Sequence, residues 1–97
     1  MRVIAISTLR DYWTKHPECE QPLTEWYLKT CRADWRSLSD MRRDFNSVDY
    51  VGNQHYVFNI KGNHYRLVAA IKYIPKLVYL RFIGTHDEYG KIDVSTI

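Results

Sequence analysis

The sequence predicts an α+β fold, in which two or three N-terminal helices pack on one face of a small, curved, antiparallel β-sheet. Apolar residues repeat at helical spacing through the first half of the chain. From Ser47 onward the hydrophobic pattern changes to a period of two, which is typical of strands with one buried face. Gly62 and Asn63 separate two such runs and suit a two-residue hairpin loop, because both tolerate positive φ.

Length and composition predict a single folded domain over residues 1–97. The chain is 45% hydrophobic and 26% charged, and it contains no apolar run near the roughly 20 residues that cross a bilayer. The first residues turn polar too soon for a signal-peptide core, so a cytoplasmic location is expected. A formal charge of +3 permits a polyanionic partner but does not require one.

The cysteines and histidines indicate neither a disulfide framework nor a metal centre. Cys19 and Cys31 are the only thiols, and they are not in a CxxC pair. The four histidines show no HxxxH spacing and no pairing with cysteine. We therefore expect no metal and no cofactor.

The helical half opens with a predicted strand over residues 2–6. Ser7 or Thr8 then offers an N-cap, with Asp11 as the capping-box partner of Thr8, and Pro17 ends the first helix. A second helix begins around Pro22, and its packed face consists of Leu23, Trp26, Tyr27, Thr30 and Cys31. A third is capped by Ser37; it packs through Leu38, Met41 and Phe45 and exposes Arg42 and Arg43.

The β half reads as a meander. A short strand at 48–51 and a turn at 52–53 precede three longer runs, at residues 55–61, 64–73 and 77–84. A two-residue loop at 62–63 makes Asn59 oppose Arg66 and Val57 oppose Val68. One face of this hairpin is then apolar and should receive the helices; it carries Tyr56, Phe58, Ile60, Tyr65, Leu67, Ala69 and Ile71.

The other face of the hairpin is polar and basic, with Asn59, Lys61, His64, Arg66 and Lys72. If the next loop is Pro75–Lys76, Tyr79 opposes Lys72 and Arg81 opposes Ala70 on this same face, whereas a longer turn can change that parity. Cations this close repel unless an anion joins them. The pattern therefore favours an anion-binding face over an ordinary solvated surface.

Titratable groups gather in the stretch THDEYG that follows the last strand. Thr85 and Glu88 have the spacing of a capping box, and Gly90 suits the end of a single helical turn. His86 and Tyr89 should then lie at the rim of the basic face, with Asp87 exposed. Histidine titrates near neutral pH, so His86 is the candidate acid or base.

These C-terminal residues resemble a known family. The stretch over residues 56–93, through FNIKGN, YRLV, YLRFIGTH and KID, is similar to the HigB toxins, a branch of the RelE-like superfamily of bacterial type II toxin–antitoxin systems. The helical half agrees in length and layout but carries little diagnostic sequence. The resemblance implies a RelE-like sheet flanked by helices and a metal-independent mRNA endonuclease (mRNA interferase) acting on ribosome-bound message. It also implies a HigA-like antitoxin partner.

The resemblance also implies roles for single residues. Arg66 resembles the arginine that follows the hairpin in RelE-like toxins, His86 falls near a rim cation, and Tyr89 resembles an aromatic used in stacking or proton transfer. Val57 and Asn59 stand where some relatives have lysines, so the general base is not assigned. Gly90 stands where many HigB-like sequences have Asp, which loosens the end of the terminal turn.

The predicted site therefore has two parts. Arg66, Arg81, His86 and Tyr89 are the candidate catalytic residues, with the arginines on the phosphate, His86 as acid or base and Tyr89 stacking on a base. The candidate RNA-binding residues are Asn59, Lys61, His64 and Lys72. Two alternatives stay open: a module that binds RNA or the ribosome without cleaving, and a structural subunit whose surface only meets a partner protein.

Overall fold

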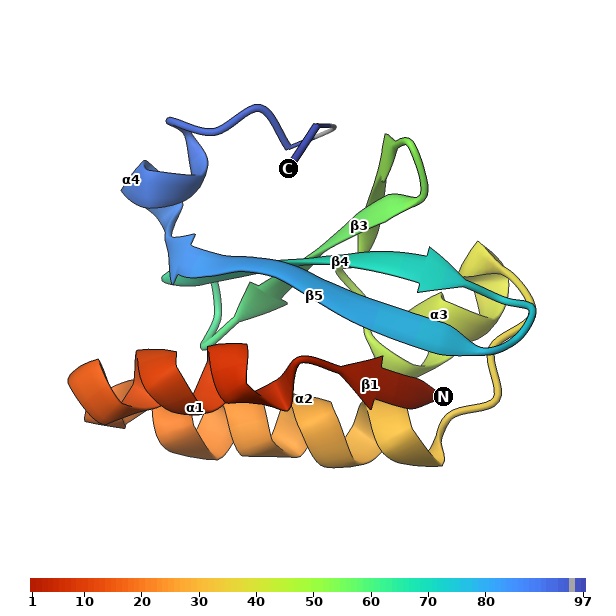
Figure 1. Cartoon of the computed structure of the whole chain (residues 1–97), viewed down its shortest axis with the longest axis horizontal. Coiled ribbons are helices and arrows are strands. Elements are labelled where there is room, and N and C mark those ends of the chain that lie inside the picture. Colours follow the sequence, from red (N-terminus) through yellow and green to blue (C-terminus); the bar gives the residue numbers. More distant parts are fainter. Residues whose placement is uncertain (95) are drawn as a thin grey trace.

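The computed structural model describes residues 1–94 and 96–97 and has the predicted α+β architecture (Figure 1). In chain order the elements are β1 (Arg2–Ile4), α1 (Ile6–Lys15), the 3₁₀ turn η1 (Pro17–Cys19), α2 (Glu20–Arg32), α3 (Leu38–Asp44), β2 (Asp49–Gly52), β3 (His55–Ile60), β4 (Tyr65–Lys72), β5 (Leu77–Thr85) and α4 (His86–Tyr89). None of the helices among the described residues has the length and apolarity needed to cross a bilayer.

The sheet has the strand order β1-β5-β4-β3-β2. Strands β2 to β5 form the predicted antiparallel meander. The first strand differs from the prediction, because β1 pairs with β5 in parallel, with Arg2 opposite Leu77. The three helices lie between β1 and the meander in the chain, so the sheet is mixed and β1 occupies one of its edges.

The main core lies between the sheet and the helices. Figure 1 shows α1 and α2 side by side under one face of the sheet. The apolar face predicted for the hairpin is confirmed, because all seven of its residues belong to this core. Phe58 lies at its centre, with ring centroids 5.4 Å from Trp26 and 5.2 Å from Phe45. Aromatic contacts of this kind contribute stability beyond the burial of area.

The ends of two helices differ from the prediction. Helix α1 starts at Ile6, and its N-cap is Ala5 in a left-handed conformation with φ 71° and no side-chain hydrogen bond. The predicted caps Ser7 and Thr8 are therefore wrong, because the chain turns sharply at Ala5 and places both residues inside the first turn; the Thr8 amide donates to the Ala5 carbonyl at 2.9 Å. Helix α2 starts at Glu20, two residues before the predicted Pro22.

The packed faces of α2 and α3 are mostly as predicted. Leu23, Trp26 and Thr30 are buried, but Cys31 is exposed, since the buried stripe of α2 is narrower than the sequence pattern. The predicted cap of α3 is confirmed, because the Ser37 hydroxyl accepts from the Asp40 amide at 3.3 Å.

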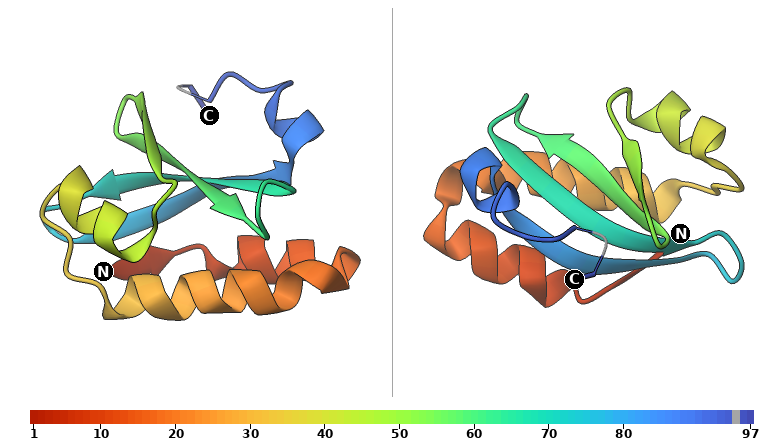
Figure 2. Two further views of the ribbon diagram at one scale, coloured as in Figure 1. Left: turned by 180° about the vertical axis from the view of Figure 1, so that it is seen from behind. Right: turned by 90° about the horizontal axis from the view of Figure 1, so that it is seen from above.

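The second face of the sheet is not the open basic surface that the sequence predicts. Val57, Val68 and Ala70 lie on it and are buried, although they are not part of the core beneath the helices. The segment after α4 runs back across this side of the sheet (Figures 1 and 2). His55 connects the sheet to the C-terminal segment. Its buried ring has Nδ1 2.8 Å from the Asn53 carbonyl oxygen and Nε2 3.0 Å from the Ile97 oxygen. The cations are therefore confined to the margins of this face.

We expect His55→Ala to detach the C-terminal segment from the sheet. The variant loses both polar contacts of the ring, which lowers the free energy of unfolding by about 1–3 kcal/mol. Limited proteolysis and urea unfolding measure the two effects. The control is His64→Ala, a histidine exposed in a turn; equal protease resistance of the segment in both variants would refute the anchoring role of His55.

Candidate functional site

The β3–β4 hairpin has the predicted register. Asn59 pairs with Arg66 and Val57 with Val68. Arg66 in turn pairs with Gly84 of β5. Because directly opposed residues share a face, Asn59, Arg66 and Gly84 form one row across three strands, at the end of the sheet where the β3–β4 turn lies.

The register between β4 and β5 differs from the prediction. Tyr79 pairs with Ala70 and Leu77 with Lys72, so the loop has four residues instead of two. A change of two residues preserves the facing of each side chain. A bulge follows opposite Val68 and Ala69, and it makes Arg81 an extra residue on β5 with no direct partner. The Arg81 guanidinium lies 5.5 Å from the centroid of the Tyr79 ring, and Arg81 also lines a groove with Thr8, Asp11 and Tyr12 of α1.

A backbone hydrogen bond brings two predicted site segments together. The His86 amide donates to the His64 carbonyl at 3.2 Å, which joins the first turn of α4 to the β3–β4 turn. Arg66 is the second residue of β4 and lies at this same end of the sheet. Its Nη1 donates to the carbonyls of Asn63 (3.1 Å) and Tyr65 (3.4 Å). His64, Arg66 and His86 therefore lie at one end of the sheet, and His64 and His86 are exposed.

Three of the predicted residues lie elsewhere. Lys72 is at the opposite end of β4, roughly 20 Å from Arg66 along the strand, and its ammonium donates to Gln54 Oε1 at 3.2 Å. Arg81 lies between these ends, roughly 10 Å along β5 from Gly84. Lys61 lines a groove of about 560 Å³ with α2, and Asn59 lines the same groove. The single cluster predicted from sequence is therefore divided.

Arg66 has no carboxylate partner in the described part of the chain. The ion pairs among the described residues are formed instead by His16, Arg36, Arg42, Arg43 and Lys76. Both Arg66 contacts are made by Nη1, so its Nε and Nη2 hydrogens remain for another acceptor. This geometry suits a phosphate, which guanidinium groups bind through paired N–H donors.

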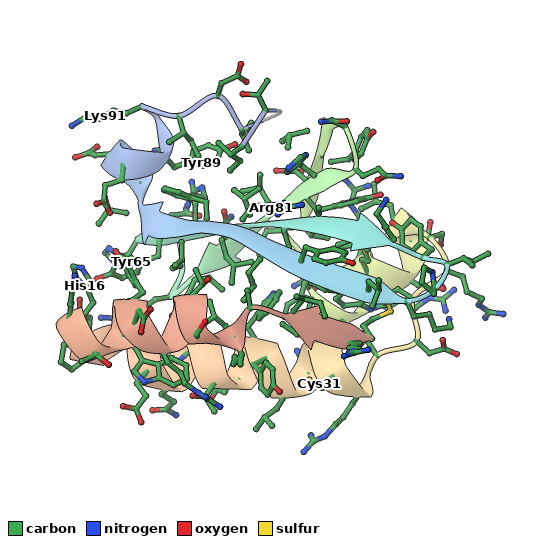
Figure 3. All side chains as sticks on the ribbon, viewed as in Figure 1. His16, Cys31, Tyr65, Arg81, Tyr89 and Lys91 are labelled. Carbon is green, nitrogen blue, oxygen red and sulfur yellow. The ribbon has the colours of Figure 1, made fainter. Side chains whose placement is uncertain are left out.

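The predicted capping box of α4 is confirmed. The Glu88 amide donates to Thr85 Oγ1 at 3.1 Å, and the Thr85 amide donates to Glu88 Oε1 at 2.7 Å. Gly84 makes room for this arrangement: a Cβ there would lie 2.6 Å from Phe82 Cζ and 3.0 Å from Glu88 Oε1. Tyr89, half-buried, lies on the same short turn (Figure 3).

Sequence reasoning missed a polar network beneath α4. The Tyr65 hydroxyl donates to Glu18 Oε1 at 2.5 Å, and the Tyr12 hydroxyl donates to Glu88 Oε1 at 3.4 Å. The Tyr12 ring stacks on His16 with centroids 4.2 Å apart; Figure 3 shows His16 and Tyr65 close together below α4. Burial, assisted by the Glu88 charge, raises the pKa of Tyr12 to about 12. These residues come from separate elements, so no local sequence motif could predict that they lie together.

The fold and the cationic end of the sheet together define a small α+β domain suited to an anionic ligand. The model of the HigB toxin family, RelE-like toxic components of toxin–antitoxin systems, matches residues 19–92, and the chain belongs to this family. The resemblance drawn from residues 56–93 is thus confirmed and extends into the helical half.

Similar proteins agree with this assignment. The chain is 29% identical over 92 residues to the mRNA interferase toxin HigB of Escherichia coli K12, which covers 92% of this chain and 88% of that protein. It is 27% identical over 94 residues to the mRNA interferase HigB of E. coli O6:H1, with 95% and 91% covered. The mRNA interferase HigB of Shigella flexneri is also 29% identical over 92 residues.

We expect Gly84→Ala to destabilise the fold by about 1–3 kcal/mol, because the added methyl group overlaps the Phe82 ring and displaces the Glu88 carboxylate. Urea unfolding measures the change. Gly90→Ala is the matched control, since its Cβ would lie no closer than 3.4 Å to the Asp87 carbonyl. Similar stabilities of the two variants would contradict the close packing at Gly84.

The pH dependence of stability should report the α4 cap. The Thr85 amide, which donates to the carboxylate, is the largest cause holding the pKa of Glu88 below its ordinary 4.5. A group whose pKa is lower in the folded state contributes its full stability above the unfolded pKa, and this contribution is lost as the pH falls through the folded pKa. The stability difference between the native chain and Glu88→Gln should therefore shrink below pH 4.5. Urea unfolding above and below pH 4.5 measures this difference in unfolding free energy. A difference that does not change with pH would argue against the role of the Glu88 charge in the cap.

Proposed function

We propose that this chain is the toxin of a toxin–antitoxin pair and that it cleaves mRNA with its own side chains. The observation that supports this most is the hydrogen bond from the His86 amide to the His64 carbonyl, since it holds an exposed imidazole at the end of the sheet where Arg66 lies. Family membership supplies the toxin class, and the names of the E. coli and Shigella relatives supply the substrate.

The reaction is an internal transfer at the RNA phosphodiester. The 2′-oxygen attacks phosphorus and loses its proton to a base, while the bond to the 5′-oxygen breaks and an acid protonates the leaving oxygen. Cleavage leaves a 2′,3′-cyclic phosphate and a 5′-hydroxyl. Negative charge builds on the phosphate oxygens during the step, so cations fixed beforehand lower the barrier most.

In this proposal Arg66 stabilises this charge. Its Nη1 is held by the carbonyls of Asn63 and Tyr65, which orients the guanidinium and leaves Nε and Nη2 to donate to the phosphate. Asn59, its direct partner on β3, lies beside it and can donate to the ribose or an adjacent phosphate. A guanidinium keeps its charge at all working pH values, so this contribution does not titrate.

His86 is the acid or base of this scheme, and His64 provides a second imidazole on the adjoining turn. General acid–base help of this kind contributes about 10²–10⁴-fold. Tyr89 stacks on a base of the splayed RNA strand, as single-stranded RNA is commonly bound. Arg81 over the Tyr79 ring would hold a flanking nucleotide, with Lys72 steering the RNA from the far end.

The biological setting is proposed on the same basis. The protein works in the cytoplasm on message engaged by the ribosome, and a HigA-like antitoxin neutralises it. The toxin–antitoxin class of the family supports an antitoxin partner. Coexpression with a HigA-like antitoxin should abolish toxicity if this partner is correct.

The decisive variants are Arg66→Ala and His86→Ala. Each should lower the rate of RNA cleavage by about 10²-fold or more, because one removes charge stabilisation and the other removes proton transfer. Purified protein is incubated with RNA alone and with translating ribosomes, and new 5′ ends are mapped. Arg43→Ala is the control, since this arginine is exposed on α3 and pairs with Asp40.

Two results would overturn the proposal. Cleavage at the native rate by both variants would remove Arg66 and His86 from the mechanism. Intact message with stalled translation, in the presence of native protein, would show a binder that blocks translation without cleaving.

A further inference from the structure

The α4 turn has little means of its own to hold a position. It spans only His86–Tyr89, and none of its residues is buried. A catalytic group must nevertheless be held close to its productive geometry, because a displacement of about 1 Å can cost on the order of 10²-fold in rate. Neighbouring elements must therefore supply the restraint.

One carboxylate connects α4 to both the sheet and the first helix. Glu88 Oε1 accepts from the Thr85 amide at 2.7 Å and from the Tyr12 hydroxyl of α1 at 3.4 Å. The same oxygen lies 3.0 Å from the position of a Cβ on Gly84, so the absence of a side chain there is what admits it. The oxygen of this exposed side chain is thus contacted by two elements besides α4 itself, β5 and α1.

Tyr12 is itself held on two sides. Its ring stacks on His16 with centroids 4.2 Å apart and planes inclined by 20°. It also meets the edge of Tyr65 at 6.1 Å, and Tyr65 donates to Glu18 in η1. The Tyr12 hydroxyl is therefore presented to Glu88 by a ring whose position α1, η1 and β4 determine together.

We propose that Tyr12 and Glu88 are positioning residues for RNA cleavage, through which α1 sets the location of His86 and Tyr89. The inference rests on the proposed function, because it assumes that α4 carries the reacting groups. Neither side chain touches RNA in this scheme; each acts through the turn that it holds. The pKa shifts agree with the contact: donation from the Thr85 amide, and to a lesser extent from the Tyr12 hydroxyl, lowers the pKa of Glu88, while burial and the Glu88 charge raise the pKa of Tyr12.

The titratable groups around Glu88 come from all the packed elements. Tyr12 faces it from α1 and His16 from the C-cap of that helix; a His16 charge is a minor cause of the lowered Glu88 pKa. Thr85 faces it from the end of β5. Glu18 of η1 is a second carboxylate nearby: it accepts from Tyr65, and its charge is a minor cause of the raised Tyr12 pKa.

The test uses two conservative substitutions and their combination. Tyr12→Phe keeps the ring stack and removes only the hydroxyl, and Glu88→Gln keeps an oxygen that can cap Thr85 but removes the charge. Each should lower kcat by about tenfold while KM for RNA stays unchanged, because RNA binding does not use these groups. The double variant should be little worse than Tyr12→Phe alone, since Glu88→Gln weakens the same contact that Tyr12→Phe removes.

A control and a second readout separate positioning from simple loss of stability. Tyr50→Phe is the matched control: Tyr50 is half-exposed on β2, and its hydroxyl contact with the Gln54 amide lies at the other end of the sheet. Hydrogen exchange of the His86 amide should be faster in Tyr12→Phe than in Tyr50→Phe, with similar thermal midpoints. Unchanged kcat and unchanged exchange in Tyr12→Phe and Glu88→Gln, while His86→Ala is inactive, would refute the positioning role and leave the proposed function intact. Full activity of His86→Ala would instead refute the proposed function.

Discussion

The pairing of β3 with β4 is the constraint on which the rest of the structure depends. Asn59 faces Arg66, and this register places the odd-numbered residues of β4 over the helices and the even-numbered ones on the other side. A slip of one residue would exchange the two sets and bring Arg66 into the core, where a guanidinium without a partner is very costly. The same register therefore builds the core around Phe58 and leaves Arg66 at the margin of the opposite face.

The location of the site follows from this hairpin and from the strand beside it. Strand β5 returns alongside β4 and ends level with the β3–β4 turn, so the short helix that follows it meets that turn. The proposed site thus combines a sheet row, which carries Arg66, with a short turn, which carries His86. Helix α4 is too short to hold its own position. The Tyr12 hydroxyl of α1 and the space left by the missing side chain of Gly84 help to hold Glu88, and with it α4, in place.

The second face of the sheet shows how a small domain gains a second buried layer. Its centre is apolar at Val57, Val68 and Ala70, and the C-terminal segment covers this side, with His55 bonded to Ile97. Cations cannot occupy such a centre, so they lie along its margins. This distribution leaves an exposed cationic end beside α4, while Lys72 and Lys61 are directed to other parts of the molecule.

Local patterns determined the fold class, the hairpin register, the Ser37 cap and the Thr85–Glu88 capping box, because each depends on residues within a few positions of one another. The family motifs in residues 56–93 likewise lie in one continuous stretch. Only the tertiary structure decided the parallel pairing of β1, the bulge at Arg81 and the burial of His55 under the C-terminal segment. It alone placed Tyr12 against Glu88, 76 residues apart in the chain. Alternation assigns a side chain to a face, but its distance from other groups depends on loop lengths and on packing between segments that no local pattern contains.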